Sequence, residues 1–550
     1  MEKGLPIGIE NYIDAQQYYY VDKTMFVKEI LQRYIGKALL ITRPRRFGKT
    51  LLLSMMDAFF DILGSNESLF ADKKILIEMP ASRRFLNQVP VVHLNMKNVT
   101  GTSQEEILYK AKDEIIAAYR RYAFLKDSPA LYANDKLEFV KILNGEIEEE
   151  FIYKNAIKKL CSYLFAHYQK KAIILIDEYD TPLESAYSNG IYDQCIAFFK
   201  ELYSSSLKGN EYVMFSICTG VLELSKESLF SGLNNLEVSS VASADLSKYL
   251  GFTEEEVKEM LSYYQDQTDI HELSKWYGGY DFSEVEIYNP WSVLNYIKFH
   301  EFAPYWVNTG SNHLIDELLD EPTRNELLSL LNSERIVHLN MAINYRDLKQ
   351  DSNAIYSYLV HAGYLLARSN GSGSYRLGLI NDEIYAMFQK DIIGRGSKEE
   401  GLEIAKSLRA AFLDGDASRI GAILEEYVLF SFSYYDLRKE KDYQHVFVGL
   451  LSVLFPDYVV QSEVSGSKGR CDIMISPKRI GGIGAIVELK YYDYVLSKTT
   501  LETRLNGCIK QIKEHGYYEE LLRRKCKKIF LYGFVFDVTK HGSMVKTMNL

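Results

Sequence analysis

A loop ending in Gly48-Lys49-Thr50 constrains this chain most strongly. It lies between an apolar, strand-like run, Ala38–Thr42, and an apolar helical stretch, Leu51–Leu63. In this context backbone N–H groups at the helix start cradle phosphates, the lysine reaches the β and γ oxygens, and the threonine hydroxyl ligates Mg²⁺. The sequence therefore predicts a nucleotide site made of Arg43, Pro44, Arg45, Arg46, Phe47, Gly48, Lys49, Thr50 and Leu51.

Arginine enriches this loop. Arg43 stands where phosphate-binding loops usually have their first glycine, and Arg45 and Arg46 follow within three residues. Three guanidinium groups raise the positive potential around a site for phosphates. A chance Gly-Lys-Thr is the alternative, which the flanking strand and helix disfavour.

A second apolar run, Ala172–Ile176, ends in acids. Asp177 at its carboxyl end lies where ligands bind in open α/β sheets and is expected to hold Mg²⁺. Glu178 is placed to orient or deprotonate an attacking water, whereas Asp180 has no assigned role. An exposed acidic loop is the alternative. Thr219, after the run Val213–Cys218, would either sense the γ-phosphate or cap the next helix.

The fold class follows from how these runs are arranged. Short apolar runs alternate with helical stretches from about residue 34 to residue 219, which is the pattern of a doubly wound α/β domain with a buried parallel sheet. The chain then becomes mainly helical. Residues 354–388 read as helix, hairpin and helix, which indicates either a winged helix or a packing connector. A fairly polar helical stretch, Ser397–Ala422, is predicted to act as a bridge.

Acids and a lysine recur near the C-terminus on two predicted neighbouring strands. Asp472 begins one strand, and Glu488 and Lys490 end the next. Glu488 and Lys490 are two residues apart, so they share one face of their strand, while Val487 and Leu489 point into the core. Two carboxylates can hold Mg²⁺ for phosphodiester hydrolysis, with the lysine positioning water or stabilising charge. A surface salt bridge is the alternative.

Composition excludes several classes of protein. The 550 residues carry a net charge of -10, so any nucleic-acid binding must come from local patches. The first residues lack a secretory signal, and no apolar run approaches the roughly 20 residues that span a bilayer. The six cysteines form no CxxC pair. We therefore expect a cytoplasmic protein that uses no membrane, and an oligomer remains open.

Family resemblance extends the N-terminal interpretation. The segments Leu5–Ile9, Tyr20–Thr24, Arg43–Thr50, Asp177–Pro182, Thr219–Val221, Phe230–Asn235, Trp276–Tyr280 and Tyr288–Trp291 resemble the AAA-ATPase-like family of bacterial proteins. The resemblance covers about residues 5–306, includes the arginine at position 43, and implies ATP as the nucleotide. It also suggests that Tyr20–Thr24 lies near the base.

The C-terminal segment resembles the PD-(D/E)XK nuclease superfamily over about residues 444–536. This likeness implies that Asp472, Glu488 and Lys490 are catalytic, that Glu463 is a further metal ligand, and that Arg470 and Gln511 contact nucleic acid. Gln511 is alternatively a contact for metal-bound water. Related nucleases place a tyrosine one helical turn after this glutamine. Here that position is His515, and Tyr518, seven residues on, would share the Gln511 face.

The resulting hypothesis has three domains. Residues 1–245 form a P-loop AAA-like ATPase domain, residues 246–440 a mainly helical lid or winged-helix-like connector, and residues 441–550 a restriction-endonuclease-like α/β domain. The expected function is an ATP-regulated nuclease that uses ATP and Mg²⁺ or Mn²⁺ and acts on nucleic acid, with DNA favoured; the architecture suggests a role in genome defence or mobile-element biology. The rivals are a regulatory ATPase switch whose C-terminal domain only binds nucleic acid or a protein partner, and a scaffold that binds ATP without turnover.

Overall fold

The computed structural model describes most of the chain in two compact units. Unit 1 comprises residues 1–323 and 334–387, and unit 2 comprises residues 324–333 and 388–550. The described residues are 3–224, 229–230, 233–241, 243, 246–281, 285–306, 335–343, 345–349, 351–371, 373–393, 398–424, 440–466, 469–479, 481–492, 494, 498–537 and 544–549. Part of the Phe230–Asn235 motif, residues 231 and 232, lies outside them.

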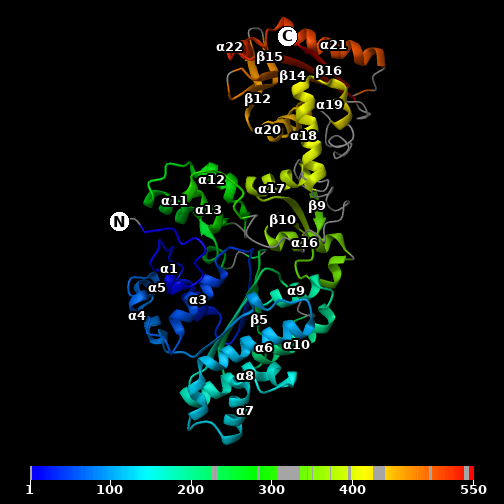
Figure 1. The fold of residues 1–550 in the computed structure, drawn as a ribbon. Helices are drawn as coiled ribbons and strands as arrows, with labels where there is room; N and C mark the ends of the chain where they lie inside the picture. Colours follow the sequence, from blue (N-terminus) through cyan, green and yellow to red (C-terminus); the bar gives the residue numbers. More distant parts are fainter. Residues whose placement is uncertain are drawn as a thin grey trace. The chain divides into compact units, whose positions relative to one another are not determined.

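A parallel five-stranded sheet is the centre of unit 1 (Figure 1). Its order is β2-β3-β4-β1-β5, so β4 separates the strand before the glycine-rich loop from the strand that ends in acids. All residues of β1 and β3 are buried, because helices cover both faces. The strands are β1 (Ala38–Thr42), β2 (Val91–Asn95), β3 (Ala172–Asp177), β4 (Val213–Gly220) and β5 (Leu236–Ser239).

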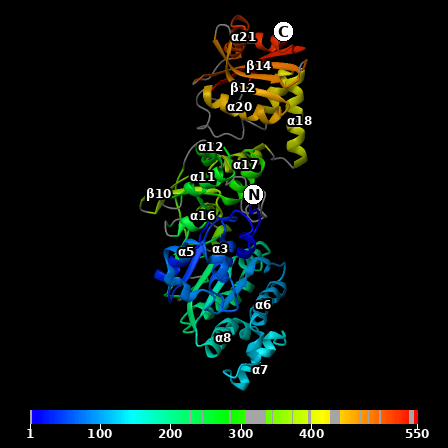
Figure 2. The same cartoon turned by 90° about the vertical axis from the view of Figure 1, so that its left-hand side faces the viewer.

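Helices lie on both faces of this sheet. On one face, α2 and α3 pack Phe26 and Phe59 against Leu39, Ile173 and Ile217. The long helices α6, α8 and α10 contact one another on the other face, opposite α3 in Figures 1 and 2. The helices of this region are α1 (Tyr12–Ala15), α2 (Phe26–Arg33), α3 (Lys49–Phe60), α4 (Glu67–Phe70), α5 (Lys74–Glu78), α6 (Gln104–Arg121), α7 (Ala133–Leu143), α8 (Glu150–Tyr168), α9 (Thr181–Ser188) and α10 (Tyr192–Leu207). The predicted doubly wound domain is confirmed.

An aromatic-rich helical region follows within the same unit. It contains α11 (Glu254–Tyr263), α12 (Ile270–Tyr277), α13 (Pro290–Phe299) and a small sheet of β6 (Phe252–Thr253), β8 (Glu286–Tyr288) and β7 (Tyr280–Asp281). Its core includes Tyr277, Tyr288 and Tyr296 and also takes up Tyr19 from the N-terminal segment. Because these packing contacts continue past residue 245, unit 1 does not divide at the expected boundary.

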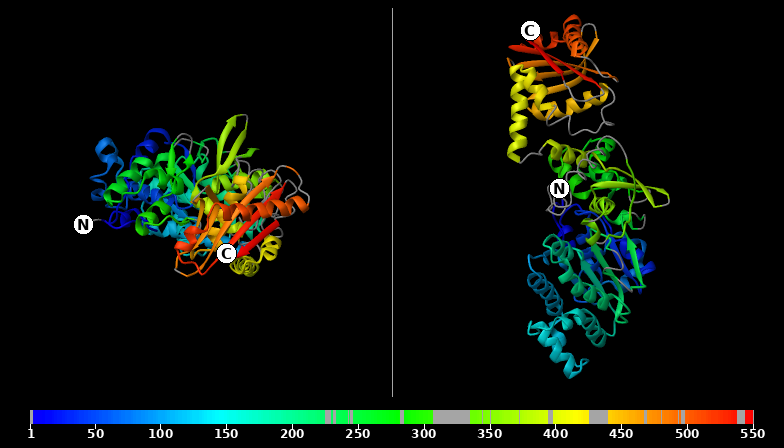
Figure 3. Two further views of the ribbon diagram at one scale, coloured as in Figure 1. Left: turned by 90° about the horizontal axis from the view of Figure 1, so that it is seen from above. Right: turned by 90° about the vertical axis from the view of Figure 1, so that its right-hand side faces the viewer.

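The predicted helix–hairpin–helix completes unit 1. It consists of α16 (Ser352–Ala362), β10 (Leu365–Gly371), β11 (Ser374–Leu379) and α17 (Asp382–Ile393), and β9 (Arg335–His338) joins the hairpin as a third strand. The hairpin projects from the unit in Figures 2 and 3. Residues 355–362 of α16 are all buried. This burial favours a packing role over a helix that reads nucleic acid.

Unit 2 is a five-stranded mixed sheet with helices on both faces. The order is β12-β13-β14-β15-β16, with only the β14–β15 pair parallel. The strands are β12 (Tyr458–Gly466), β13 (Gly469–Pro477), β14 (Ile483–Tyr492), β15 (Lys528–Asp537) and β16 (Met544–Asn549), and the helices are α18 (Lys398–Asp414), α19 (Ala417–Ile423), α20 (Glu440–Leu454), α21 (Lys498–Glu514) and α22 (Glu519–Arg523).

The expected bridge before residue 441 belongs to this unit. Leu408, Phe412 and Ile420 of α18 and α19 are buried against the sheet, and the Tyr532 hydroxyl donates to the Phe412 carbonyl. Figure 3 shows α18, in yellow, lying along the orange and red sheet. Residues 388–550 therefore belong to one unit, which includes the expected bridge.

Candidate functional sites

The glycine-rich loop turns directly into helix α3. Gly48 precedes this helix with a φ of 82°, in the left-handed region that glycine tolerates without a steric cost. The ammonium of Lys49 donates to the carbonyls of Arg43 and Pro44, at 2.8 and 2.9 Å. Burial lowers the pKa of Lys49. The loop thus closes around a buried lysine at the N-terminus of a helix, the geometry that binds phosphate.

Two predicted residues, Thr50 and Thr219, meet at Asp177. Thr50 donates its hydroxyl hydrogen to Asp177 Oδ2 at 2.6 Å, and the Thr219 hydroxyl donates to Oδ1. Asp177 and Thr219 are fully buried at the ends of β3 and β4. A hydroxyl beside a carboxylate supplies the oxygen ligands that Mg²⁺ prefers, with water completing its shell. These residues fit the expected magnesium ion.

The next acids have different environments. Glu178 has a φ of 51°, accepts a hydrogen bond from the Thr181 hydroxyl at 3.2 Å, and lines a cavity. Burial raises the pKa of Glu178, and Asp177 and Asp180 add to the effect, as suits a proton acceptor. Asp180 instead accepts from the backbone N–H groups of residues 221 and 222, both at 2.8 Å, and burial raises its pKa to about 6. Asp180 therefore holds the loop after β3 to the residues that directly follow β4.

The three loop arginines diverge. Arg43 is fully buried and donates to the backbone and hydroxyl oxygens of Ser239 on β5. Its carbonyl, rather than its guanidinium, faces Lys49. Arg45 pairs with Glu184 of α9 at 3.0 Å. Arg46 lies 4.6 Å over the Trp291 ring and 3.8 Å from Glu10.

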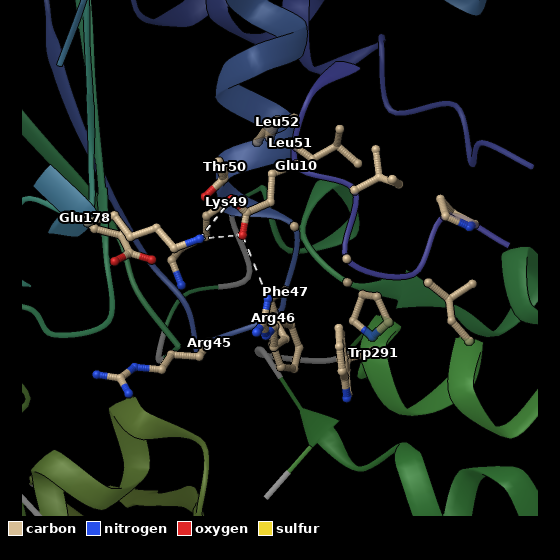
Figure 4. Close-up of a pocket in the computed structure, with 18 of the residues that line it drawn as sticks. Glu10, Arg45, Arg46, Phe47, Lys49, Thr50, Leu51, Leu52, Glu178 and Trp291 are labelled. Carbon is tan, nitrogen blue, oxygen red and sulfur yellow. Dashed lines mark hydrogen bonds and ion pairs between the residues drawn. The ribbon is translucent and has the colours of Figure 1, made fainter. Parts of the chain in front are cut away.

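A cavity of about 740 Å³ opens beside the loop within unit 1 (Figure 4). This volume is within the range of small-molecule sites. Its wall includes Arg45 to Leu52 and Glu178, together with residues that the site prediction left out. These additional residues include Glu10, Tyr249, Phe252, Trp291 and Leu294. Tyr20 and Lys23 line the same cavity, as the family resemblance suggested, whereas Trp291 had only its place in a family motif as a signal.

The C-terminal candidates meet on β13 and β14. Lys490 donates to Glu488 Oε1 at 3.1 Å, and the Leu489 N–H donates to Asp472 Oδ2 at 2.7 Å. Val487 and Leu489 are buried in the core on the opposite face. Because Asp472 and Glu488 lie on neighbouring strands, with Glu488 buried and Asp472 half-buried, the exposed salt bridge considered from the sequence does not describe this site.

Electrostatics make the carboxylate pair unusual. Glu488 is 1% exposed, and its Oε2 has no hydrogen-bond partner among the described residues. Burial, followed by the charge of Asp472, raises the pKa of Glu488 to about 7. Burial also raises the pKa of Asp472. For Lys490, burial disfavours the charged ammonium, but the charges of Glu488 and Asp472 outweigh this effect and raise the pKa of Lys490. A cation near Glu488 Oε2 would relieve this strain.

Gln511 and Glu440 complete the immediate surroundings. The Gln511 amide, on α21, donates to Glu488 Oε1. Glu440, at the start of α20, lies 3.2 Å from the Lys490 ammonium. Sequence reasoning missed Glu440. The sequence indicates Glu440 only through its place one helical turn before Gln444. In the structure, the Gln444 amide donates to the Asp472 carbonyl at 2.9 Å.

Glu463 and Arg470 lie further out. They pair with each other at 3.4 Å, and their side chains are 50% and 67% exposed. Over the described parts of the chain, no three acidic, histidine or cysteine side chains are grouped to hold a metal. Asp472 and Glu488 alone could supply two ligands, and water or phosphate oxygens would supply the rest.

The expected tyrosine is Tyr517 rather than Tyr518. Helix α21 ends at Glu514, and Gly516 has a φ of 63°, so helical spacing does not continue to residue 518. The Tyr517 hydroxyl lies 2.8 Å from His515 Nδ1, and the Gln511 side chain is near enough to lower the pKa of Tyr517 against the larger effect of burial. The turn thus returns a tyrosine hydroxyl to the glutamine beside Glu488.

Comparison with known proteins agrees with the two predicted domain types. Residues 6–230 match the family of predicted AAA-ATPases, and residues 438–544 match the PD-(D/E)XK nuclease superfamily. An uncharacterized protein in the vnfD 5' region of Azotobacter chroococcum mcd 1 is 26% identical over 552 residues, which cover 97% of this chain and 96% of the relative. The chain therefore combines an AAA-ATPase-like domain with a C-terminal domain of the nuclease superfamily.

Proposed function

We propose that this chain is an ATP-regulated, Mg²⁺-dependent nuclease that acts on DNA. The observation that carries the proposal is the buried Glu488 carboxylate, whose Oε2 has no hydrogen-bond partner among the described residues and whose neighbours are Asp472 and Lys490. Such a site favours a divalent cation, and a cation between two carboxylates supports phosphodiester hydrolysis.

The ATPase half of the proposal rests on the unit 1 cavity. Lys49 and the loop N–H groups would bind the β- and γ-phosphates, and Thr50 and Asp177 would hold Mg²⁺. Glu178 would take a proton from the attacking water, and Thr219 would hold Asp177 in place. Tyr20 and Trp291 would border the base, because both line the same cavity and Figure 4 shows Trp291 away from Lys49. Arg43 would act through its carbonyl, since its guanidinium is committed to β5.

The nuclease half rests on unit 2. Asp472 and Glu488 would hold Mg²⁺ or Mn²⁺, which supplies charge neutralisation and an activated water when bound. Lys490 would orient that water and stabilise charge on the phosphate. Gln511 would position Glu488, and the exposed Arg470 would contact the nucleic acid, while Glu463, which pairs with Arg470 further out, is left without a role at the metal.

The location of this activity is also a proposal. No helix in the described parts of the chain is long and apolar enough to cross a membrane. All six cysteines are free thiols, which suits the reducing cytoplasm predicted from the sequence.

The test is a cleavage assay with two matched losses. Wild type should cut DNA with Mg²⁺ or Mn²⁺ at a rate that changes with ATP. Asp472→Ala should not cut under any condition, and Lys49→Ala should cut at a rate that ATP no longer changes. If wild type cuts but ATP has no effect, the regulatory half of the proposal is wrong. If wild type hydrolyses ATP and never cuts, the regulatory switch takes its place.

A further inference from the structure

Arg45 is held at two points in the cavity wall. Its carbonyl accepts a hydrogen bond from Trp306 Nε1 at 2.9 Å, which fixes the backbone of the loop. Its guanidinium donates to both oxygens of Glu184, at 3.0 and 3.3 Å. Both side chains line the cavity, and that of Arg45 is 40% exposed. The backbone is thus fixed while the charged end faces solvent-accessible space.

The charge of Arg45 acts on the residues around the predicted γ-phosphate position. Its positive charge favours the ionised form of Glu178 and disfavours the charged form of Lys49, as expected of a cation in the same cavity wall. Figure 4 shows Arg45 and Glu178 on the same side of the loop, with the guanidinium pointing away from Lys49. A contact with the γ-phosphate requires the guanidinium to leave Glu184 and turn toward Lys49.

We propose that Arg45 is a catalytic arginine supplied in cis, which binds the γ-phosphoryl oxygens in the transition state of ATP hydrolysis while Glu184 holds it when it is not engaged. This proposal rests on the proposed ATPase function. It implies that the chain hydrolyses ATP without an arginine from a second subunit.

The chemistry balances with residues already present. The water oxygen forms a bond to the γ-phosphorus, its proton passes to Glu178, and the bond from that phosphorus to the β–γ bridging oxygen breaks, which releases ADP and phosphate. Negative charge grows on the γ-oxygens and the bridging oxygen as this occurs. A guanidinium in contact with those oxygens stabilises the charge, an effect worth roughly a thousandfold or more in rate for arginines placed this way.

The two partners of the ion pair make opposite predictions. If Arg45 is catalytic, Arg45→Ala should lower kcat roughly a thousandfold and keep ATP binding, and Glu184→Gln should keep or raise kcat. Arg45→Lys should stay impaired, because an ammonium lacks the planar fork. A merely structural ion pair would make Arg45→Ala and Glu184→Gln equally harmful. Arg120→Ala, an exposed arginine on α6, is the matched control and should behave as wild type.

The experiment measures ATP turnover and ATP binding by the full chain. Turnover per chain should not change on dilution, and free guanidinium should partly restore Arg45→Ala. Full activity in Arg45→Ala, equal losses in Arg45→Ala and Glu184→Gln, or turnover that falls on dilution would overturn the proposal. If wild type binds ATP but never hydrolyses it, the proposed ATPase function itself fails, which is a distinct outcome. Circular dichroism and retained ATP binding show whether each variant is folded.

Discussion

Lowering the pH should weaken metal binding at the C-terminal site. Burial and the neighbouring Asp472 raise the pKa of Glu488 from an ordinary 4.5 to about 7. That difference corresponds to about 3 kcal/mol against carrying the charge. Because the folded-state pKa is raised, protonated Glu488 favours the folded state. The metal-free unit therefore has its full free energy of unfolding below about pH 4.5 and loses this contribution as the pH rises toward 7.

A divalent ion binds the ionised form, so it competes with this proton below pH 7. With one proton at a pKa of about 7, the Mn²⁺ affinity should fall about tenfold from pH 8 to pH 6, and about 0.9 proton should be released per ion at pH 6. Calorimetry in two buffers of different ionisation enthalpy measures both quantities.

Two variants control the measurement. Glu488→Gln should lose Mn²⁺ binding at every pH, because it lacks the charge that the ion needs. Glu514→Gln, which changes an exposed carboxylate on α21, should keep the tenfold dependence. If the Mn²⁺ affinity of wild type changes less than about twofold between pH 8 and pH 6, the pKa of Glu488 is not raised, since Glu488 would then already be ionised at pH 6.

Three further variants test single residues. Glu178→Gln should bind ATP normally and hydrolyse it at least about a hundredfold more slowly, the usual cost of losing a general base; undiminished turnover would exclude Glu178 from that role. Lys490→Ala should keep Mn²⁺ in calorimetry and lose DNA cleavage on gels, and a simultaneous loss of metal would show that Lys490 instead maintains the site. Asp180→Ala should lower the free energy of unfolding by about 2 kcal/mol or more, because the backbone N–H groups of residues 221 and 222 lose their acceptor; an unchanged melting temperature would contradict this anchoring role.

The glycine-rich loop and the acids after β3 could be predicted because their signals are local. A strand, a tight turn and a helix follow one another between residues 38 and 63, and the sequence shows each directly. The same holds for Glu488 and Lys490, since strand alternation alone puts them on one face. The positions of these side chains therefore needed little knowledge of the rest of the fold.

Residues whose roles depend on distant partners could not be predicted. Arg43 turns toward Ser239, 196 residues away, and no local pattern shows that contact. Glu440 meets Lys490 only because α20 packs beside β14. The packing of α18 on the sheet of unit 2 was not predicted, because α18 is polar on one face, while Leu408 and Phe412 on its other face are covered by the sheet.

The proposed ATP-regulated, metal-dependent nuclease activity is best tested by a cleavage assay with the purified wild-type chain. Plasmid DNA, linear DNA and RNA would each be incubated with Mg²⁺, Mn²⁺ or EDTA, with and without ATP. We expect cleavage of DNA that requires the metal, changes with ATP and disappears in Asp472→Ala. The absence of both Mn²⁺ binding and cleavage under every ATP condition would contradict it and leave the C-terminal unit as a binding module.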